Sequence, residues 1–176
     1  MNALRRLARF AAQIEYAALP ARIKEQSKAC LLYGLAVAAA SARIPLSSLA
    51  LALPSAGAGA TRLVDGAEVG AGAAAFANAM LFHARIQEDA HPAGHVGVVV
   101  LPAALAQAQC AGASGQDLLA AIAAGYEIAL RIGRDHAADL SERGFRTTSV
   151  YGPIGAAAAC ARLLRANHSA CGNALA

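Results

Sequence analysis

The stretch "GASGQDLLAAIAAGYEIALRIGRD", residues 112–135, decides the fold. Ser114 and Asp117 form an S-x-x-D pattern, in which the serine side chain caps the free amides of a helix's first turn. Leucine, isoleucine and alanine then recur at helical spacing as far as Gly133. The stretch therefore predicts a long helix that begins directly after Ser114.

The same apolar periodicity recurs along most of the chain, which is rich in alanine and leucine. The other predicted helices span residues 3–18, 20–41, 71–85, 98–111 and 149–166, and one more begins near residue 167. We predict a loop over residues 138–148. The fold class expected is all-α, a single multi-helix domain.

The helical pattern breaks between Pro45 and Gly72, where proline and glycine are frequent. Within this segment, "TRLVDGAEVG" places Asp65 and Gly66 between two short alternating runs. An Asp-Gly pair in this setting is typical of a two-residue hairpin turn. We therefore expect a short β-hairpin near residues 61–69.

The composition is unusually apolar, because 57% of the 176 residues are hydrophobic and 15% are charged. Ordinary domains have roughly 45–50% apolar and about 25% charged residues. Either the chain buries a surface against something else, or it enters a membrane. The uncharged window at residues 96–116 contains Pro102, Gln107 and Gln109, so we expect no membrane span there.

The charges and the cysteines indicate which partners, which compartment and which cysteine chemistry to expect. The net charge is +4, but the basic residues are scattered, so we expect no nucleic-acid partner. Gln13 and Glu15 interrupt the apolar stretch that a signal peptide needs, and we expect a cytoplasmic protein. The four cysteines lie far apart and are expected to be small buried hydrophobic residues rather than a disulfide or zinc framework: Cys30, Cys110, Cys160 and Cys171.

Titratable groups are concentrated in "QEDAHPAGHVGVVVLP", residues 87–102, a predicted loop between two helices. It carries two acids and two histidines: Glu88, Asp89, His91 and His95. They could be metal ligands, although Pro92 and Gly94 argue against a helix that holds both histidines on one face. They could transfer protons, since histidine titrates near neutrality and a carboxylate can orient it. Alternatively, the acids cap the next helix and the histidines are ordinary loop residues.

A second polar cluster lies in "SERGFRTTSVYGPIGAA", residues 141–157. Basic and hydroxyl side chains precede a helix start, where exposed amides favour an anion: Arg143, Arg146, Thr147, Thr148, Ser149 and Tyr151. Arg146 could hold a substrate carboxylate in bidentate fashion. The alternative is simple N-capping by Thr148 or Ser149 beside solvated arginines.

Four stretches together resemble one family, the MmgE/PrpD proteins, which include 2-methylcitrate dehydratase, cis-aconitate decarboxylase and iminodisuccinate epimerase. They are "AAFANAMLFHA", "HPAGHVGVVVLPAALAQAQ", "GASGQDLLAAIAAGYEIALRIG" and "RGFRTTSVYGPIGAAAACARLL". The resemblance implies a large helical domain that carries most of the active site and the dimer contact, with a smaller α+β lid domain. Residues 1–176 would then be an incomplete helical domain, without its remainder and without the lid.

The resemblance also suggests roles for individual residues. The family's "HP…H" element matches His91, Pro92 and His95, and the second histidine is the usual candidate for proton transfer. The acidic element before it is altered, with Arg85 and Gln87 where aspartates are expected. Glu88 keeps a carboxylate, Asp89 stands in place of a threonine, and Arg146 stands where the family often has a histidine.

The function implied is that of a lyase or isomerase resembling 2-methylcitrate dehydratase, acting on a small polycarboxylate by proton abstraction beside a carboxylate, without cofactor or metal. His95 would be the acid or base, with His91, Glu88 and Asp89 beside it. The substrate would be held by Arg85, Arg146, Thr147, Thr148 and Ser149. We expect a homodimer through helical surfaces and no activity of the 176 residues alone. The alternatives are a truncated, non-catalytic helical dimerisation module and a metal-dependent enzyme.

Overall fold

The structure is a computed structural model that describes residues 2–52 and 56–176. Within these ranges it is helical apart from one two-stranded hairpin, which confirms the predicted all-α class. The elements, in order, are α1 (Ala3–Gln13), η1 (Tyr16–Ala18), α2 (Ala21–Ser41), η2 (Pro45–Ala52), β1 (Ala60–Arg62), β2 (Ala67–Val69), α3 (Ala71–His83), α4 (Gly97–Cys110), α5 (Gly115–Gly133), α6 (Ala137–Glu142), α7 (Thr147–Leu163) and α8 (His168–Leu175).

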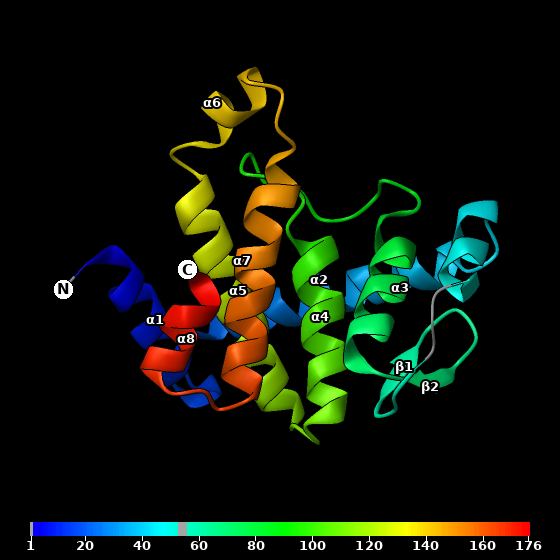
Figure 1. Cartoon of the computed structure of the whole chain (residues 1–176), viewed down its shortest axis with the longest axis horizontal. Helices are drawn as coiled ribbons and strands as arrows, with labels where there is room; N and C mark the ends of the chain where they lie inside the picture. Colours follow the sequence, from blue (N-terminus) through cyan, green and yellow to red (C-terminus); the bar gives the residue numbers. More distant parts are fainter. Residues whose placement is uncertain (1, 53–55) are drawn as a thin grey trace.

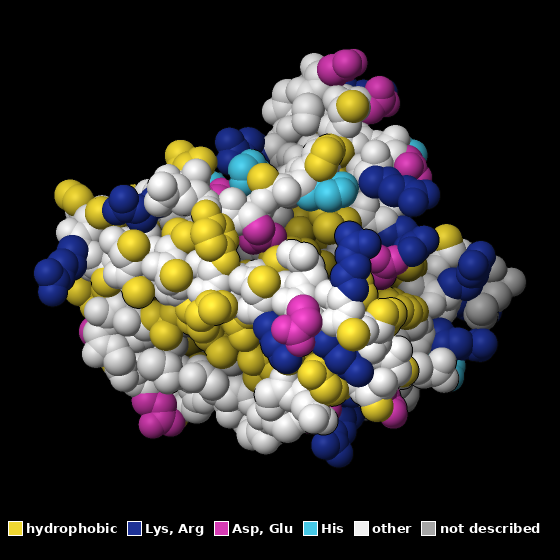
Figure 2. Space-filling view, turned by 180° about the vertical axis from the view of Figure 1, so that it is seen from behind, with side chains coloured by type: hydrophobic (Ala, Val, Ile, Leu, Met, Phe, Trp, Pro, Cys, Tyr) yellow, Lys and Arg dark blue, Asp and Glu magenta, His cyan; other side chains and the backbone are white. Residues whose placement is uncertain are grey.

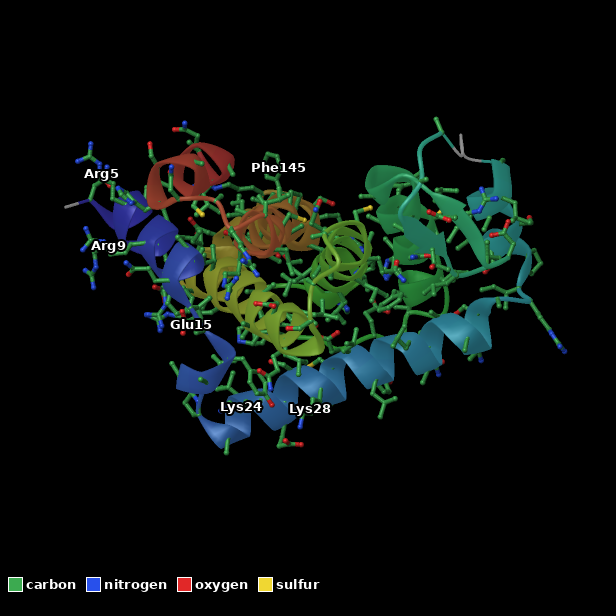
Figure 3. The ribbon with its side chains drawn as sticks, turned by 90° about the horizontal axis from the view of Figure 1, so that it is seen from below. Arg5, Arg9, Glu15, Lys24, Lys28 and Phe145 are labelled. Carbon is green, nitrogen blue, oxygen red and sulfur yellow. The ribbon has the colours of Figure 1, made fainter. Side chains whose placement is uncertain are left out.

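Helices α5, α7, α4 and α3 form a row at the centre of the molecule (Figure 1). In this row α7 packs between α5 and α4, and α3 packs on the other side of α4. The long helix α2 crosses behind the row and contacts α3, α4 and α5, which is clearest when the row is seen end-on (Figure 3). The main hydrophobic core lies between these helices and includes Phe82, Leu101 and Ile122.

Helices α5 and α7 approach each other closely because small residues line their contact. A Cβ atom added to Gly125 would lie 2.7 Å from the carbonyl oxygen of Gly155, and the reverse holds for Gly155. Ala129 and Ala159, both fully buried, flank this contact. The small side chains thus let two backbones touch, and the contact fixes α5 and α7 relative to each other.

The cap predicted at Ser114 is confirmed, because its Oγ accepts a hydrogen bond from the amide of Asp117 at 3.1 Å. The last predicted helix is also present as α8, where the side chain of Asn167 accepts from the amides of Ser169 and Ala170. The loop predicted over residues 138–148 is partly wrong, because α6 occupies Ala137–Glu142. Six residues are too few to show a helical period in the sequence.

The first helix is shorter than predicted. α1 ends at Gln13, and the η1 turn follows instead of further α-helix. The carbonyl oxygen of Ile14 accepts a hydrogen bond at 2.7 Å from Nε of Arg162 on α7, so a distant side chain replaces the helical partner. On α1, Ala8 and Ala11 are buried, whereas Arg5 and Arg9 point away from the bundle (Figure 3).

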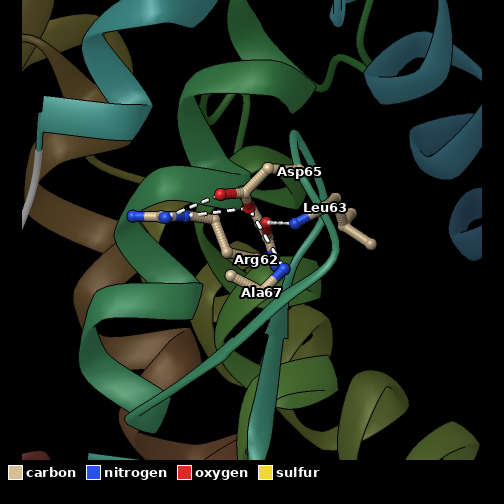
Figure 4. Close-up of polar contacts among 5 residues, drawn as sticks. Arg62, Leu63, Asp65 and Ala67 are labelled. Carbon is tan, nitrogen blue, oxygen red and sulfur yellow. Dashed lines mark hydrogen bonds and ion pairs between the residues drawn. The ribbon is translucent and has the colours of Figure 1, made fainter. Parts of the chain in front are cut away.

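The hairpin predicted near residues 61–69 is confirmed, although four residues, 63–66, connect its strands instead of the two typical of an Asp-Gly turn. β1 pairs antiparallel with β2, and Gly66 takes a positive φ of 74° in the turn. Asp65 closes the turn, because its carboxylate accepts from Arg62 at 2.7 and 3.0 Å and from the amide of Ala67 at 3.2 Å (Figure 4). The hydrogen bonds from Arg62 lower the pKa of Asp65.

A buried asparagine ties the hairpin to α3. Asn78 is fully buried, its Oδ1 accepts from the amide of Leu63 at 2.7 Å, and its Nδ2 donates to the carbonyl oxygen of Thr61 at 2.9 Å. The hairpin is therefore fixed to the bundle by polar contacts as well as by its small apolar cluster.

Large hydrophobic side chains remain exposed on the face that α2 crosses. Leu32 and Tyr33 of α2 are 71% and 49% exposed, and Leu46 and Leu49 of η2 are also exposed. Figure 2 shows hydrophobic side chains gathered across this face. In the described part of the chain no single helix is long and apolar enough to cross a membrane, and only α2 with η2, bent by 98°, passes by length and composition as a pair.

Candidate functional site

The segment predicted to carry the chemistry, residues 84–96, connects α3 to α4 at the end of the bundle where α7 begins (Figure 1). A tight reversal organises it: the amide of Gly94 donates to the carbonyl oxygen of His91 at 2.8 Å, and the amide of His91 donates back at 3.3 Å. Gly94 has a φ of 127°, a conformation that favours glycine. A Cβ there would also press against Thr147 and Thr148 at 3.0–3.1 Å, so the glycine lets the loop touch α7.

This contact anchors His95. Its backbone amide donates a hydrogen bond of 2.9 Å to Oγ1 of Thr148, in the first turn of α7. Thr148 thus has a partner within the protein, in addition to any role toward substrate. The second polar cluster of the sequence is therefore brought against the first.

Glu88 forms the centre of the site. Its side chain is only 2% exposed, and Oε1 lies 2.7 Å from Nδ1 of His83 and 3.0 Å from Nδ1 of His95. The contact with His83 has hydrogen-bond geometry, whereas that with His95 is at ion-pair distance without it. The two rings are each 39% exposed, and their centroids are 6.5 Å apart. One buried carboxylate therefore faces two accessible imidazoles.

The Glu88 carboxylate can accept a further hydrogen bond. Among the described residues, its second oxygen, Oε2, has no hydrogen-bond partner although it is buried. A buried carboxylate oxygen without a donor is costly, and such exceptions are frequent at functional sites. The geometry therefore favours a functional over a purely structural role for this carboxylate.

Asp89, the next residue, contacts a different element. Its Oδ2 accepts a hydrogen bond of 2.8 Å from the hydroxyl of Tyr126 on α5. Burial raises the pKa of Asp89, and the Tyr126 hydrogen bond opposes that rise. Burial together with the neighbouring Asp89 charge raises the pKa of Tyr126. Asp89 is thus a supported, partly buried group and does not touch the imidazoles.

His91 lies apart from this centre. It is exposed, and its Nδ1 accepts a hydrogen bond of 3.0 Å from the amide of Ala93. Its ring therefore stabilises its own turn. The structure does not bring His91 to Glu88, and His83 occupies the position beside Glu88 that was expected for His91.

The residues predicted to hold substrate are at the surface. Arg85 is exposed and donates from Nε to the side chain of Gln87 at 2.9 Å. Arg146 is exposed at the N-cap position of α7, and Ser149 is exposed in the first turn. Arg146 and Ser149 lie beside Thr147 and Thr148, at the same end of the bundle as the histidines. These placements are compatible with anion binding and leave it a prediction.

Both capping alternatives from the sequence are wrong. α4 begins at Gly97 with Val96 at its N-cap and no side-chain cap, so neither Glu88 nor Asp89 caps it. α7 likewise has Arg146 at its N-cap, so capping by Thr148 or Ser149 is wrong. Across residues 2–52 and 56–176, no group of three or more His, Cys, Asp or Glu side chains is arranged to hold a metal ion.

Sequence reasoning missed two residues of the site, His83 and Tyr126. His83 ends α3 five residues before Glu88, and a histidine so close to the acidic segment is a usable signal. Tyr126 lies 37 residues after Asp89 in the middle of α5, and no local pattern marks it. Tyr126 reaches the site because α5 packs against the loop that carries Asp89.

Comparison with known proteins identifies the family of this chain. The MmgE/PrpD N-terminal domain profile matches residues 5–176. Cis-aconitate decarboxylase of Aspergillus terreus is 30% identical over 161 aligned residues, covering 83% of this chain and 32% of the relative. The cis-aconitate decarboxylase-like protein oryM of Aspergillus oryzae is 31% identical over 186, covering 93% and 36%. The chain thus spans about a third of the length of these relatives. With a match over nearly its whole length, it belongs to the MmgE/PrpD family.

Proposed function

We propose that this chain is the N-terminal helical part of a lyase or isomerase that abstracts a proton beside a carboxylate of a small polycarboxylate. The observation that carries the proposal is the buried Glu88 carboxylate facing Nδ1 of both His83 and His95. A carboxylate at Nδ1 orients an imidazole and selects its tautomer, as in other acid/base sites. Nε2 of each ring is then available to substrate.

His95 is the proposed base. With the proton on Nδ1 next to Glu88, Nε2 carries the lone pair that takes a proton from carbon. The imidazolium formed in this step is stabilised by the Glu88 carboxylate. The hydrogen bond from the His95 amide to Thr148 keeps the residue in place during the transfer.

His83 is the proposed partner, in place of His91, which was expected from the sequence. Its ring shares the same carboxylate oxygen, 6.5 Å from the ring of His95. Two imidazoles with one carboxylate allow one ring to remove a proton while the other supplies one. In dehydration, the carbon–hydrogen electron pair becomes the new double bond as protonated hydroxide leaves. In decarboxylation, carbon dioxide leaves and the carbon takes a proton.

The substrate class follows from the family and from the surrounding charge. The names of the relatives specify cis-aconitate, a tricarboxylate, so cis-aconitate is the first substrate to test. Arg85 and Arg146 are the proposed anion holders, since arginine binds carboxylates in bidentate fashion. Thr147, Thr148 and Ser149 would add hydroxyl groups at the start of α7. No cofactor is required by this chemistry.

The extent of the chain bears on its activity. Because it spans about a third of its relatives' length, we propose that other segments of such a protein complete the site. Catalytic groups that act as a unit fail together when part of the unit is missing. We therefore expect no measurable dehydration of methylcitrate by the 176 residues alone, and robust turnover by them would contradict this expectation.

The test uses the protein expressed from the complete coding sequence that contains these residues. It is incubated in D2O with a panel of di- and tricarboxylates, and 1H NMR follows deuterium incorporation and product formation. His95→Gln should lower kcat by about 10²-fold or more, the usual contribution of a general base. His168→Gln, on the exposed start of α8, is the matched control and should leave kcat unchanged. Equal rates for His95→Gln and wild type would refute the proposal.

The exposed apolar face of α2 favours a second candidate, a non-catalytic helical module that dimerises. Leu32 and Tyr33 are large apolar side chains left open on this face, and contiguous exposed apolar surface often marks an interaction site. Sedimentation equilibrium would test it: a dimer that Leu32→Lys dissociates, in a protein without turnover on the panel, would support the module. A monomer would contradict it.

A further inference from the structure

Two consecutive carboxylates at the site serve different partners. Glu88 contacts His83 and His95, which belong to α3 and to the loop before α4. Asp89 accepts its hydrogen bond from Tyr126, which belongs to α5. The loop is therefore tied at Asp89 to α5, a helix that carries neither imidazole.

The Asp89–Tyr126 pair packs tightly against the start of α4. Gly97 opens α4, and a Cβ there would overlap both Oδ1 of Asp89 and the hydroxyl oxygen of Tyr126. The pair therefore fits directly against the backbone of α4. This packing leaves Asp89 little freedom to turn away from Tyr126.

A second anchor holds the other side of the site. The amide of His95 donates to Thr148 on α7, and α7 is locked to α5 by the Gly125–Gly155 contact. Tyr126 on α5 and Thr148 on α7 thus hold the same loop at Asp89 and at His95, from two helices that pack directly against each other. Glu88 immediately precedes Asp89 in the chain, so the Asp89 anchor is one peptide bond away from it.

From this geometry we infer that Tyr126 is a positioning residue, which acts through Asp89 to hold the Glu88 carboxylate against Nδ1 of His83 and His95. The inference rests on the proposed function, because it concerns the imidazoles that would move the proton. Without the Tyr126 hydroxyl, Asp89 loses this donor, and the backbone directly after Glu88 is no longer fixed. Glu88 then withdraws from the rings, and each neutral ring returns toward the tautomer with its proton on Nε2.

The experiment is a long-range 1H–15N spectrum of the histidine rings in 15N-labelled protein, which reports which ring nitrogen carries the proton. Signals are assigned with His83→Gln and His95→Gln. Tyr126→Phe should raise the share of the Nε2–H form at both rings. Tyr33→Phe, which removes an exposed phenol on α2, is the matched control and should leave the rings unchanged.

Two further variants keep the test decisive. Asp89→Ala removes the acceptor without touching α5 and should shift the rings as Tyr126→Phe does, so it decides the matter if Tyr126→Phe does not fold. Asp89→Asn retains a carbonyl oxygen for the Tyr126 hydroxyl and should preserve the wild-type ring signals. Wild-type signals in both Tyr126→Phe and Asp89→Ala, or an equal shift in Tyr33→Phe, would overturn the inference.

The outcome separates the two proposals. A tautomer response in a protein that turns over no polycarboxylate sinks the proposed function and leaves the positioning contact in place. Normal turnover with unresponsive rings sinks the positioning role alone. In an active protein, the positioning role also predicts that Tyr126→Phe lowers kcat more than it changes KM, because the residue touches the imidazole support and not the substrate.

Discussion

The backbone amide of His95 donates a hydrogen bond to Oγ1 of Thr148, although 53 residues separate them. This single contact brings the histidine loop and the polar start of α7 to one place. In the sequence they formed two unrelated clusters, each with its own structural explanation. Thr148 also shows that a residue predicted to bind substrate has a structural partner of its own.

Replacing Thr148 tests this contact directly. Thr148→Ala leaves the amide of His95 without its acceptor, and we expect the free energy of unfolding to fall by about 1 kcal/mol, the usual net value of such a bond. Thr148→Ser keeps an oxygen at the same place and is the control. Urea denaturation measures both, and hydrogen exchange at the His95 amide should accelerate in Thr148→Ala only. Identical exchange rates in the two variants would contradict the prediction.

The start of α4 offers a matched pair of glycines. Gly97→Ala forces a methyl group into Asp89 and Tyr126, and we expect a destabilisation of about 1–3 kcal/mol, as for other overpacked sites. Gly115 is also the first residue of its helix, α5, but has open space around it. Gly115→Ala should therefore stabilise the protein by less than about 1 kcal/mol through helix propensity. Thermal denaturation of the two variants measures the contrast, and equal effects would contradict it.

Asn78 is a fully buried polar link between the hairpin and the bundle. Asn78→Ala removes two hydrogen bonds from a fully buried site and leaves the amide of Leu63 without its acceptor. We expect a loss of about 2 kcal/mol or more in the free energy of unfolding. Asn173→Ala, at an exposed position of α8, should change it by no more than about 0.5 kcal/mol. Urea denaturation with equal midpoints for the two variants would show that the hairpin is held otherwise.

The fold was predictable where its causes are local. A few neighbouring residues determine each of these features: the cap at Ser114, the helical periods and the Asp65–Gly66 turn. The errors have non-local or short-range causes. α1 ends at Gln13, where the carbonyl oxygen of the next residue, Ile14, is bound by Arg162 from far along the chain, and α6 is too short to show a period.

The candidate site was predictable in part for the same reason. Glu88 and His95 lie in one segment, so their association needed no knowledge of the fold. His83 lies within the helix predicted over residues 71–85 and carries no predicted role, although it contacts Glu88 at the helix end. Tyr126 reaches Asp89 only because α5 packs against the loop, and the sequence of α5 does not reveal which face does so.

The pH dependence of stability should reveal the hairpin turn. The Arg62 hydrogen bonds lower the pKa of Asp65 in the folded protein. Between the folded and unfolded pKa values the unfolded chain binds more protons, so stability rises with pH in that window. The contribution of Asp65 is therefore fully present above its unfolded pKa, about 3.9, and is lost as the pH falls through the lower folded value. Asp65→Asn should be less stable than wild type near neutral pH, and the difference should shrink on acidification through this window. Urea denaturation from neutral pH downward measures it, and in an Arg62→Ala background Asp65→Asn should show much less of this pH dependence. A difference between wild type and Asp65→Asn that stays constant with pH would show that the ion pair does not set the stability of the turn.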